Sequence, residues 1–259
     1  MELARLKADQ HFLIDENVVD RLVDVSEVSG DDVVLDVGAG TGVITEKLAE
    51  KAKMVYAVEP DKTFEPQLAR LAARYGNIRV FWGSFLGLKL PLYNKVVSNP
   101  PFSILEPLLQ RHLRKPVPMS LIAPLRFAQT LTSERYDSLL SFRVQLAYRS
   151  MVLDVLDGSV FSPPYPGKTC ILLLRPLDLG EAERLMMIFF SQSSSKVRNA
   201  LRNVFWNRTS KREATKLVEL SNLSDGVLNK RVCRISLNDA MVVYELIKRV
   251  VLTGLRGKI

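Results

Sequence analysis

The sequence has little of what metal sites, disulfide frameworks and membrane anchors need. It holds two cysteines and two histidines in 259 residues. Neither the cysteines, Cys170 and Cys233, nor the histidines, His11 and His112, have the spacing of metal ligands, so we expect two inert core thiols and no metal. No apolar run approaches the roughly 20 residues that span a bilayer, and the first residues lack the apolar segment of a secretory signal. We therefore expect a cytoplasmic protein that does not contact membranes, and a monomer.

Acidic residues are scarce in the last third of the chain. The whole chain carries a formal charge of +8, and 47% of its residues are apolar, as in a folded globular protein. Residues 1–175 contribute a net charge of only +1, whereas residues 176–259 contribute +7. Only Glu213 interrupts a group of cations there, which are Lys196, Arg198, Arg202, Arg208, Lys211, Arg212 and Lys216. The imbalance predicts a polyanionic partner, and the alternative is a solvated helix face.

The first two thirds of the chain alternate short β-branched runs with amphipathic segments. The runs predicted as buried strands are 33–37, 54–58, 78–82, 95–98 and 119–122. The helices expected around them are 17–27, 45–51, 64–75 and 106–113. This alternation predicts a parallel, doubly wound α/β sheet.

The pattern changes near residue 176. Two apolar runs, 151–156 and 170–174, flank a proline-rich loop and predict a closing antiparallel hairpin. Beyond residue 180 the periodicity predicts amphipathic helices, at 181–191, 196–207, 211–220 and 237–251. We therefore predict two domains, an α/β domain over 1–176 and a basic helical domain over 177–259.

A glycine-rich loop follows the first predicted strand. Within the run from Asp36 to Gly42, Gly38 and Gly40 let the backbone turn sharply and approach a ligand. The second strand ends in Glu59-Pro60, where the carboxylate can accept hydrogen bonds from both hydroxyls of a ribose. The acidic Asp36 suits a cationic group, which favours S-adenosylmethionine over a dinucleotide. The alternative for Glu59 is a surface carboxylate at a strand end.

Two further loops follow the third and fourth predicted strands. The first is Gly83-Ser84-Phe85, where Ser84 can hydrogen-bond an exocyclic amine and Phe85 can flank a ring. The second is Asn99-Pro100-Pro101-Phe102. Because ligands bind open α/β sheets at the carboxyl ends of the strands, we expect all four loops to form one site.

The segment Asn99 to Phe102 has the parts needed to methylate an exocyclic amine. The amino nitrogen of adenine is a poor nucleophile because its lone pair is delocalised into the ring. The Asn99 Oδ1 atom and the Pro100 carbonyl can accept its two hydrogens, and the prolines hold these acceptors rigidly. The Phe102 ring offers a face for the base. The segment alone also fits an ordinary strand-to-loop turn.

Taken together, the motifs resemble the KsgA-type small-subunit ribosomal RNA adenine dimethyltransferases over nearly the whole chain. The segments that carry the resemblance are Gln10 to Asp15, Asp36 to Gly42, Glu59, Gly83 to Leu86, Asn99 to Phe102, Phe161 to Pro166 and Ser194 to Phe205. The resemblance implies a Rossmann-like class I methyltransferase fold with a small helical C-terminal domain. It also implies S-adenosylmethionine as the cofactor and, as the reaction, dimethylation of two adjacent adenosines near the 3′ end of small-subunit rRNA in the pre-small ribosomal subunit.

Individual residues follow the same resemblance. Gln10 and Leu13 match residues that line the cofactor pocket of the family, and Phe161 matches the second aromatic side chain that faces the target base. Two positions differ. Ser84 stands where the family usually has Asp, and Asn99-Pro100-Pro101-Phe102 stands for the usual Asn-Leu/Ile-Pro-Tyr, a form common in DNA adenine methyltransferases.

The leading hypothesis assigns three sets of residues. The target base is held by Asn99, Pro100, Phe102 and Phe161. The cofactor is bound by Gln10, His11, Leu13, Asp36, Gly38, Gly40, Glu59, Pro60, Gly83, Ser84, Phe85 and Asn99. The rRNA is bound by Lys196, Arg198, Arg202, Arg208, Lys211 and Arg212. The alternatives are an adenine methyltransferase acting on large-subunit rRNA or DNA, and a largely non-catalytic ribosome-assembly factor.

Overall fold

The computed structural model describes residues 11–206, 208–221 and 223–253, so the predicted cofactor residue Gln10 lies outside the described residues. The described residues form two compact units. One contains the residues up to Glu134 together with Tyr148–Pro176, and the other contains Arg135–Ala147 and the residues from Leu177 onward. The segment Arg135–Ala147 thus departs from the predicted 1–176 domain.

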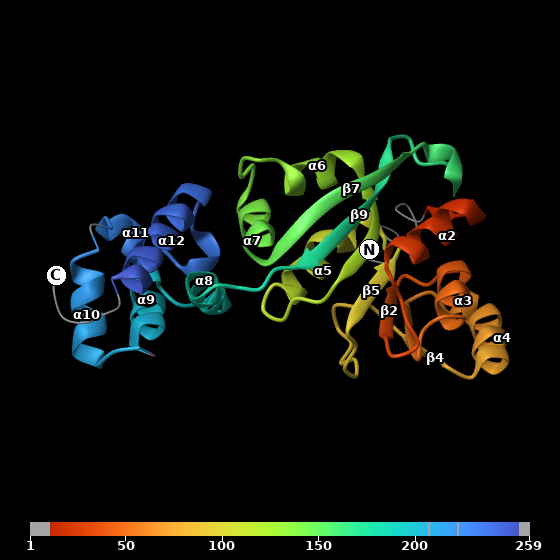
Figure 1. Ribbon diagram of the computed structural model, residues 1–259, viewed down its shortest axis with the longest axis horizontal. Helices are drawn as coiled ribbons and strands as arrows, with labels where there is room; N and C mark the ends of the chain where they lie inside the picture. Colours follow the sequence, from red (N-terminus) through yellow and green to blue (C-terminus); the bar gives the residue numbers. More distant parts are fainter. Residues whose placement is uncertain (1–10, 207, 222, 254–259) are drawn as a thin grey trace. The chain divides into compact units, whose positions relative to one another are not determined.

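A seven-stranded, mostly parallel sheet forms the centre of the first unit, in the order β4-β3-β2-β5-β6-β9-β7 (Figure 1). Strand β9 pairs antiparallel with both β6 and β7, and the other neighbours are parallel. The predicted doubly wound sheet and its closing hairpin are confirmed. The bounds are β2 (Val33–Val37), β3 (Met54–Glu59), β4 (Ile78–Trp82), β5 (Lys95–Ser98), β6 (Met119–Pro124), β7 (Tyr148–Leu156) and β9 (Thr169–Pro176).

Helices cover both faces of this sheet. Figure 1 shows α2, α3 and α4 on one side and α5 on the other. The pattern missed α6, which begins directly where β6 ends. The bounds are α2 (Glu16–Val25), α3 (Val43–Ala49), η1 (Lys62–Phe64), α4 (Glu65–Tyr75), η2 (Phe102–Ile104), α5 (Leu105–His112), α6 (Leu125–Thr132) and η3 (Gly158–Val160).

Alternate strand residues supply the core beneath α2 and α3. Val34, Val55 and Val97 belong to one buried cluster with Leu22 of α2 and Leu48 of α3. Burying aliphatic side chains of this size contributes about 1.5–3 kcal/mol each. Because neighbouring strand residues face opposite sides, the remaining apolar residues of these strands are available to the other helix layer. This explains why the strands are nearly continuous apolar runs.

Two very short strands join the start of the described chain to the proline-rich loop. Strand β1 (Phe12–Leu13) pairs antiparallel with β8 (Phe161–Ser162), with Leu13 opposite Phe161. Strands of two residues have no readable period, so hydrophobic patterns do not predict them. The pairing brings His11 beside residues some 150 positions further along the chain, as the hydrogen bond between His11 Nδ1 and the Pro163 carbonyl shows (2.9 Å).

The second unit is helical. Its core includes Phe142, whose ring centroid lies 6.4 Å from that of Phe190 and 5.8 Å from that of Tyr244. These contacts explain why Arg135–Ala147 belongs to this unit. Side-chain capping boxes at Ser210 and Ser236 begin α10 and α12. The bounds are α7 (Leu139–Ala147), α8 (Glu181–Ser191), α9 (Val197–Trp206), α10 (Lys211–Glu219), α11 (Asp225–Asn229), η4 (Val232–Arg234) and α12 (Leu237–Leu252).

The two cysteines differ in their surroundings. Cys170 lies in β9 and is buried, as predicted, and burial raises the pKa of its thiol to about 11. Cys233 is exposed, so the prediction of a second core thiol is wrong. Within η4 it is Val232, the preceding residue, that points into the core. Among the described helices, none is both long and apolar enough to cross a bilayer.

A partly buried carboxylate ties together the segments that enter the sheet. Asp32 accepts hydrogen bonds from the Ser29 backbone N–H (2.8 Å), the Asn94 side chain (2.8 Å) and Lys95 Nζ (3.1 Å). Burial by itself would raise the pKa of Asp32, but the bonds from Ser29 and Lys95 hold it below its ordinary value. Asp32 therefore stabilises the fold in its ionised form.

Replacing Asp32→Ala is expected to lower the free energy of unfolding by about 3 kcal/mol at pH 7, because Lys95 would lose its buried partner. Since the folded pKa lies below the unfolded one, the contribution of Asp32 is complete above about pH 4 and is lost as the pH falls through the folded value. Urea unfolding at pH 7 and at acid pH measures both effects. The control is Asp24→Ala, which removes the exposed pair with Lys51 and should cost clearly less. Equal losses would contradict the role of Asp32.

Candidate active site

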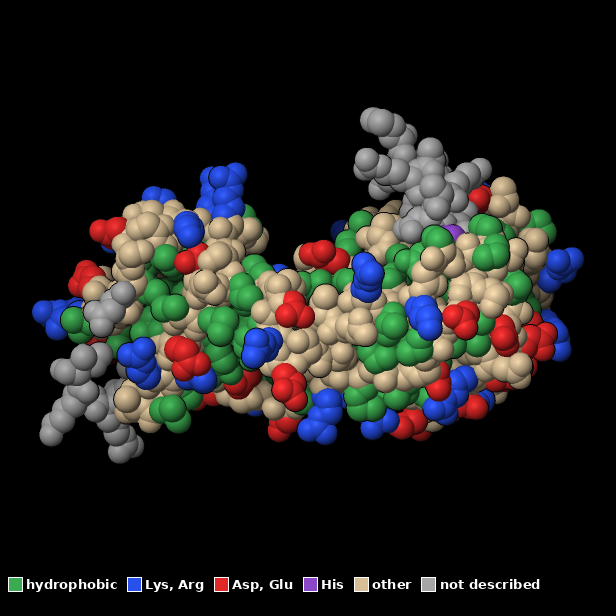
Figure 2. Space-filling view, turned by 90° about the horizontal axis from the view of Figure 1, so that it is seen from above, with side chains coloured by type: hydrophobic (Ala, Val, Ile, Leu, Met, Phe, Trp, Pro, Cys, Tyr) green, Lys and Arg blue, Asp and Glu red, His purple; other side chains and the backbone are tan. Residues whose placement is uncertain are grey.

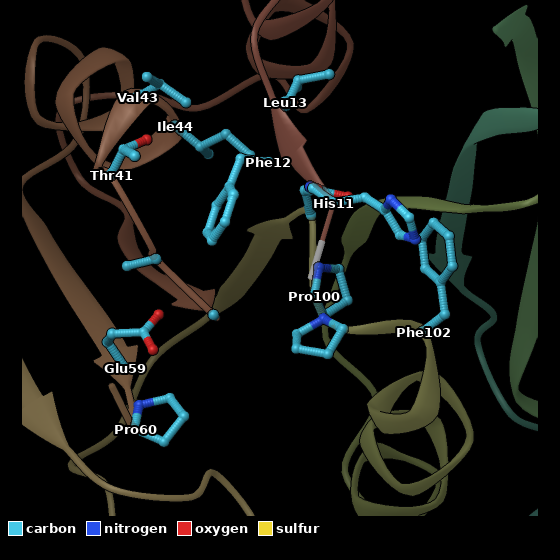
Figure 3. Close-up of a pocket in the computed structure, with 14 residues that line it drawn as sticks. His11, Phe12, Leu13, Thr41, Val43, Ile44, Glu59, Pro60, Pro100 and Phe102 are labelled. Atoms are coloured by element: carbon cyan, nitrogen blue, oxygen red, sulfur yellow. The ribbon is translucent and has the colours of Figure 1, made fainter. Parts of the chain in front are cut away.

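A cavity lies at the carboxyl edge of the central strands (Figure 3). Three segments supply most of its wall: β1, the glycine loop that leads into α3, and the loop after β5. The end of β3 completes it. The lining residues are His11, Phe12, Leu13, Gly38, Ala39, Thr41, Val43, Ile44, Glu59, Pro60, Asn99, Pro100, Pro101 and Phe102. The predicted first, second and fourth loops therefore meet at one site.

Close packing explains two of the glycines. Gly38 has φ +79°, and a Cβ atom there would lie 2.8 Å from Pro101 Cδ. Gly40 has φ +51°, and a Cβ atom there would lie 3.1 Å from the Phe12 ring. Both positions thus combine a left-handed backbone with contact from another wall of the cavity. A side chain at either one would push Phe12 or the Asn99–Phe102 loop away.

Glu59 is a buried carboxylate of the cavity wall, not a surface residue of a strand end. It is 2% exposed, and its two oxygens accept hydrogen bonds from the backbone N–H groups of Gly40 and Asp61 (2.8 Å each). Burial raises the pKa of Glu59, and the two N–H groups oppose that effect. Each carboxylate oxygen has a second lone pair, so Glu59 can still accept a hydroxyl from a ligand. This chemistry fits the ribose of S-adenosylmethionine.

Asp36 does not line the cavity. It is 1% exposed, and its Oδ2 atom accepts a hydrogen bond from Thr45 Oγ1 (2.7 Å) beneath the glycine loop. Burial raises the pKa of Asp36 to about 7. Asp36 thus lies behind the cavity wall, and its contact with the cationic end of a cofactor stays a prediction. The side chain connects the end of β2 to α3.

The third predicted loop also contributes none of the cavity-lining residues. Phe85 is buried, with its ring stacked on that of His112 at 6.5 Å and with the Arg111 guanidinium 4.6 Å from its centre. Gly83 donates its N–H to the Glu59 carbonyl (3.0 Å), which extends the β3–β4 pairing. Ser84 follows and is partly exposed. The structure places Phe85 in the packing of α5, outside the cavity lining.

The amide of Asn99 has a fixed direction. Its Nδ2 atom donates a hydrogen bond to the His11 carbonyl (2.9 Å). The side-chain NH2 is thereby engaged, and the Oδ1 atom is left as an acceptor at the cavity. Pro100 and Pro101 line the same wall. The arrangement has the acceptor polarity that an amino group requires.

An aromatic group borders this wall, and its members differ from those predicted. The rings of Phe102 and Tyr165 meet edge to face at 5.0 Å, and the His11 ring lies 5.1 Å from Tyr165 and 6.4 Å from Phe102. Figure 3 shows His11 and Phe102 side by side. Phe161 is only 1% exposed and packs in the core behind His11. The predicted second aromatic surface for a base is therefore not at Phe161, and Tyr165 was missed.

The predicted RNA-binding cations all lie in the second unit, but some already have acidic partners there. Arg198 forms an ion pair with Asp225 (2.8 Å), and Arg208 forms one with Glu181 (2.5 Å). Figure 2 shows Asp and Glu side chains among the Lys and Arg of this unit. These acidic partners lie on other helices, Asp225 on α11 and Glu181 on α8, so the spacing along one helix does not predict them.

The remaining cations of this group differ from one another. Lys196 contacts the Asn229 side chain at 3.4 Å, and Lys211 lies 5.8 Å from the Trp206 ring centre. Within the described part of the chain, Arg202 and Arg212 have no ion pair or hydrogen bond of their side chains. These two arginines are therefore the freest to meet an anion.

Two solved structures share the fold of this chain. A dimethyladenosine transferase from Plasmodium falciparum has a TM-score of 0.62 and 22% identity, with 94% of this chain and 98% of that chain covered. The 23S rRNA methyltransferase ErmE has a TM-score of 0.60 and 20% identity, with 92% and 99% covered. The fold is that of a class I methyltransferase.

The sequence then identifies the family. The family described as ribosomal RNA adenine dimethylase matches residues 1–236, and the chain belongs to it. It is 33% identical to the probable ribosomal RNA small subunit methyltransferase A of Methanosarcina mazei, over 86% of this chain and 85% of that protein. The protein of the same description from Pyrococcus abyssi is 32% identical over 74% of each. The chain is thus an S-adenosylmethionine-dependent rRNA adenine dimethyltransferase.

The buried Asp36 gives a pH-dependent prediction. Its folded pKa, about 7, lies above the ordinary value of 3.8, so the native state binds more protons than the unfolded state between these values. The free energy of unfolding should therefore fall as the pH rises from about 4 to about 7, by about 4 kcal/mol at most from this group. Asp36→Asn keeps the shape and removes the titration.

Between pH 4 and pH 7, we expect the free energy of unfolding to fall by several kcal/mol less in Asp36→Asn than in the wild type. Urea unfolding of the protein without cofactor measures both. Asp20→Asn, on the exposed surface of the same unit, is the control and should retain the wild-type pH dependence. If the wild type and Asp36→Asn lose stability in parallel, Asp36 is already ionised in the folded protein.

Proposed function

We propose that this enzyme dimethylates two adjacent adenosines near the 3′ end of small-subunit rRNA, in a precursor of the small ribosomal subunit. The observation that carries the proposal is the hydrogen bond from Asn99 Nδ2 to the His11 carbonyl, which leaves the Oδ1 atom as an acceptor. The descriptions of the relatives from Methanosarcina mazei and Pyrococcus abyssi support the small subunit as the substrate. A monomeric state and a cytoplasmic location stay predictions.

In the proposed reaction, Asn99 Oδ1 and the Pro100 carbonyl accept the two hydrogens of the adenine amino group. The two bonds draw the nitrogen lone pair out of conjugation with the ring, which makes it available to a methyl group. The Phe102 ring supports one face of the base. S-Adenosylmethionine supplies the methyl group from its sulfonium. The positive charge that the nitrogen gains makes its proton acidic, so the proton can leave to solvent.

Cofactor binding in this proposal uses only residues of the cavity wall. Glu59 accepts the ribose hydroxyls, Gly38 and Gly40 allow the backbone to approach the ligand, and Leu13 and Pro60 contribute apolar contacts. Phe161 acts as a positioning residue, because it packs behind His11 and does not face the cavity. Catalysis is then mainly positioning and placement of dipoles in a preformed site.

Asn99→Ala is expected to reduce methyl transfer about 100-fold or more, the usual effect of removing a preorganised polar contact to a reacting group. Labelled methyl transfer to small subunits from an undermethylated strain measures it, together with mapping of the modified nucleotides. S-Adenosylmethionine affinity should stay within a few-fold, because Glu59 and the glycine loop are unchanged. The control, Asn17→Ala, alters an exposed asparagine of the same unit and should be fully active.

Three results would contradict the proposal. Asn99→Ala within a factor of two of the wild type would remove Asn99 from the reaction. Label in large-subunit rRNA or DNA would assign a different substrate. Absence of label everywhere, from a protein that still binds small subunits, would indicate an assembly factor.

We further propose that the helical unit binds rRNA phosphates through its cations, with the largest contributions from Arg202 and Arg212. Arg198 and Arg208 would have to leave their ion pairs with Asp225 and Glu181 to contact a phosphate. Binding should therefore weaken with salt, and more steeply when the unpaired arginines are present.

A comparison of two double variants tests this assignment. R202Q/R212Q is expected to lose about tenfold in affinity for a small-subunit RNA hairpin at low salt and to show a shallower salt dependence. R198Q/R208Q removes the same charge, and we expect a smaller loss from it. Fluorescence titration at several salt concentrations measures both. Equal losses would show that ion pairing within the unit does not decide which arginines bind.

A further inference from the structure

A second cavity lies at the same edge of the sheet as the candidate active site. It is formed where β6 ends and α6 begins, and by the loop that leads into β9. The Leu125 backbone N–H donates to the Lys168 carbonyl (2.9 Å), which joins the two walls. Because β5 and β6 are parallel neighbours, their carboxyl ends place this cavity beside the Asn99–Phe102 loop. The proposed reaction does not use this cavity.

One aromatic ring links the two cavities. Tyr165 lines the second cavity, and its ring lies 5.0 Å from Phe102 and 5.1 Å from His11, which both line the first. If a strand whose adenine rests on Phe102 continues past Tyr165, its next nucleotide reaches the entrance of the second cavity.

The charge of the second cavity is positive. Arg126 and Lys168 line it, and its lining includes no Asp or Glu. Both side chains are exposed, and within the described residues neither has an ion pair or a hydrogen bond. Other cations of this unit, such as Arg21 and Lys95, are paired with carboxylates. Two free cations that face one cavity suit a phosphate, and arginine can bind one with two parallel hydrogen bonds.

We propose that this second cavity binds the phosphate of a nucleotide adjoining the target adenosine, through Arg126 and Lys168, with Tyr165 as the wall between that nucleotide and the target base. The inference rests on the proposed function and adds a subsite to it. Holding the neighbouring phosphate would fix the strand while the target base occupies the first cavity. It would also favour a single-stranded or unwound segment, because only there can successive nucleotides take separate positions.

A thermodynamic cycle between protein charge and one phosphate tests the proposal. The dissociation constant is measured for a hairpin RNA of the small-subunit 3′ end, and for the same RNA with a neutral methylphosphonate at either phosphate next to a target adenosine. A methylphosphonate at one of these positions should weaken the binding of the RNA to the wild type about tenfold. R126Q/K168Q should bind the unmodified RNA about tenfold more weakly than the wild type does. A methylphosphonate at the same position should then weaken the binding of this variant by a further factor of less than two.

K53Q/K115Q is the matched control. Both lysines are exposed in the same unit, they precede β3 and β6, and they therefore lie at the opposite edge of the sheet. This variant has the same net charge as R126Q/K168Q and should respond to methylphosphonate as the wild type does. Thermal denaturation of all three proteins verifies that they are folded.

The outcomes separate the two hypotheses. The subsite would be overturned if methylphosphonate at every flanking phosphate lowered the RNA affinity of the wild type and of R126Q/K168Q equally. It would also be overturned if R126Q/K168Q bound the unmodified RNA as tightly as the wild type does. Methyl transfer by the wild type to small subunits is measured separately. No label there would overturn the proposed function, whereas label together with additive losses in the cycle would overturn the subsite alone.

Discussion

The hydrogen bond from the Asn99 amide to the His11 carbonyl is the contact on which the rest of the site depends. Asn99 is fixed by the end of β5, and His11 is fixed by the bond of its ring to the Pro163 carbonyl. Three segments far apart in the sequence thus determine the direction of one amide. If the amide rotated, an NH2 group would face the substrate amine and repel it. The short β1–β8 pairing therefore matters more to the chemistry than its four residues suggest.

Two carboxylates near the ends of neighbouring strands have different surroundings, because the backbone places one at the cavity and the other behind it. Glu59 ends β3 and lines the cavity, with two backbone N–H groups that keep its oxygens in place. Asp36 lies on the neighbouring strand β2, opposite Ala57 and so two residues before the level of Glu59, where Thr45 is its hydrogen-bond donor. The first has lone pairs available for a ligand, and the second holds the loop against α3. Their residue types alone do not distinguish these roles.

Local patterns predicted the features that depend on a single segment. The strands, most helices, the glycine loop and the position of Glu59 follow from periodicity and from glycine at a turn, and these agree with the structure. What failed depends on contacts between distant segments. Phe161 belongs to the motif that matches the family, yet the β1–β8 pairing buries it and leaves Tyr165 beside Phe102. Arg198 pairs with Asp225 of α11, and Arg208, which follows α9, pairs with Glu181 of α8, so no spacing along a single helix could show these pairs.

The two units differ in net charge, and the difference bears on how each would contact RNA. The formal charge of residues 1–175 is nearly balanced, and several exposed cations there, such as Arg21, Lys51 and Arg175, are paired with carboxylates. A nearly neutral surface attracts RNA weakly, so in the proposed subsite Arg126 and Lys168 would act locally on one strand. The helical unit has the excess charge, which acts over a Debye length of about 10 Å and does not depend on exact contacts. If both proposals hold, affinity from the helical unit and register from the α/β unit are separable properties of one chain.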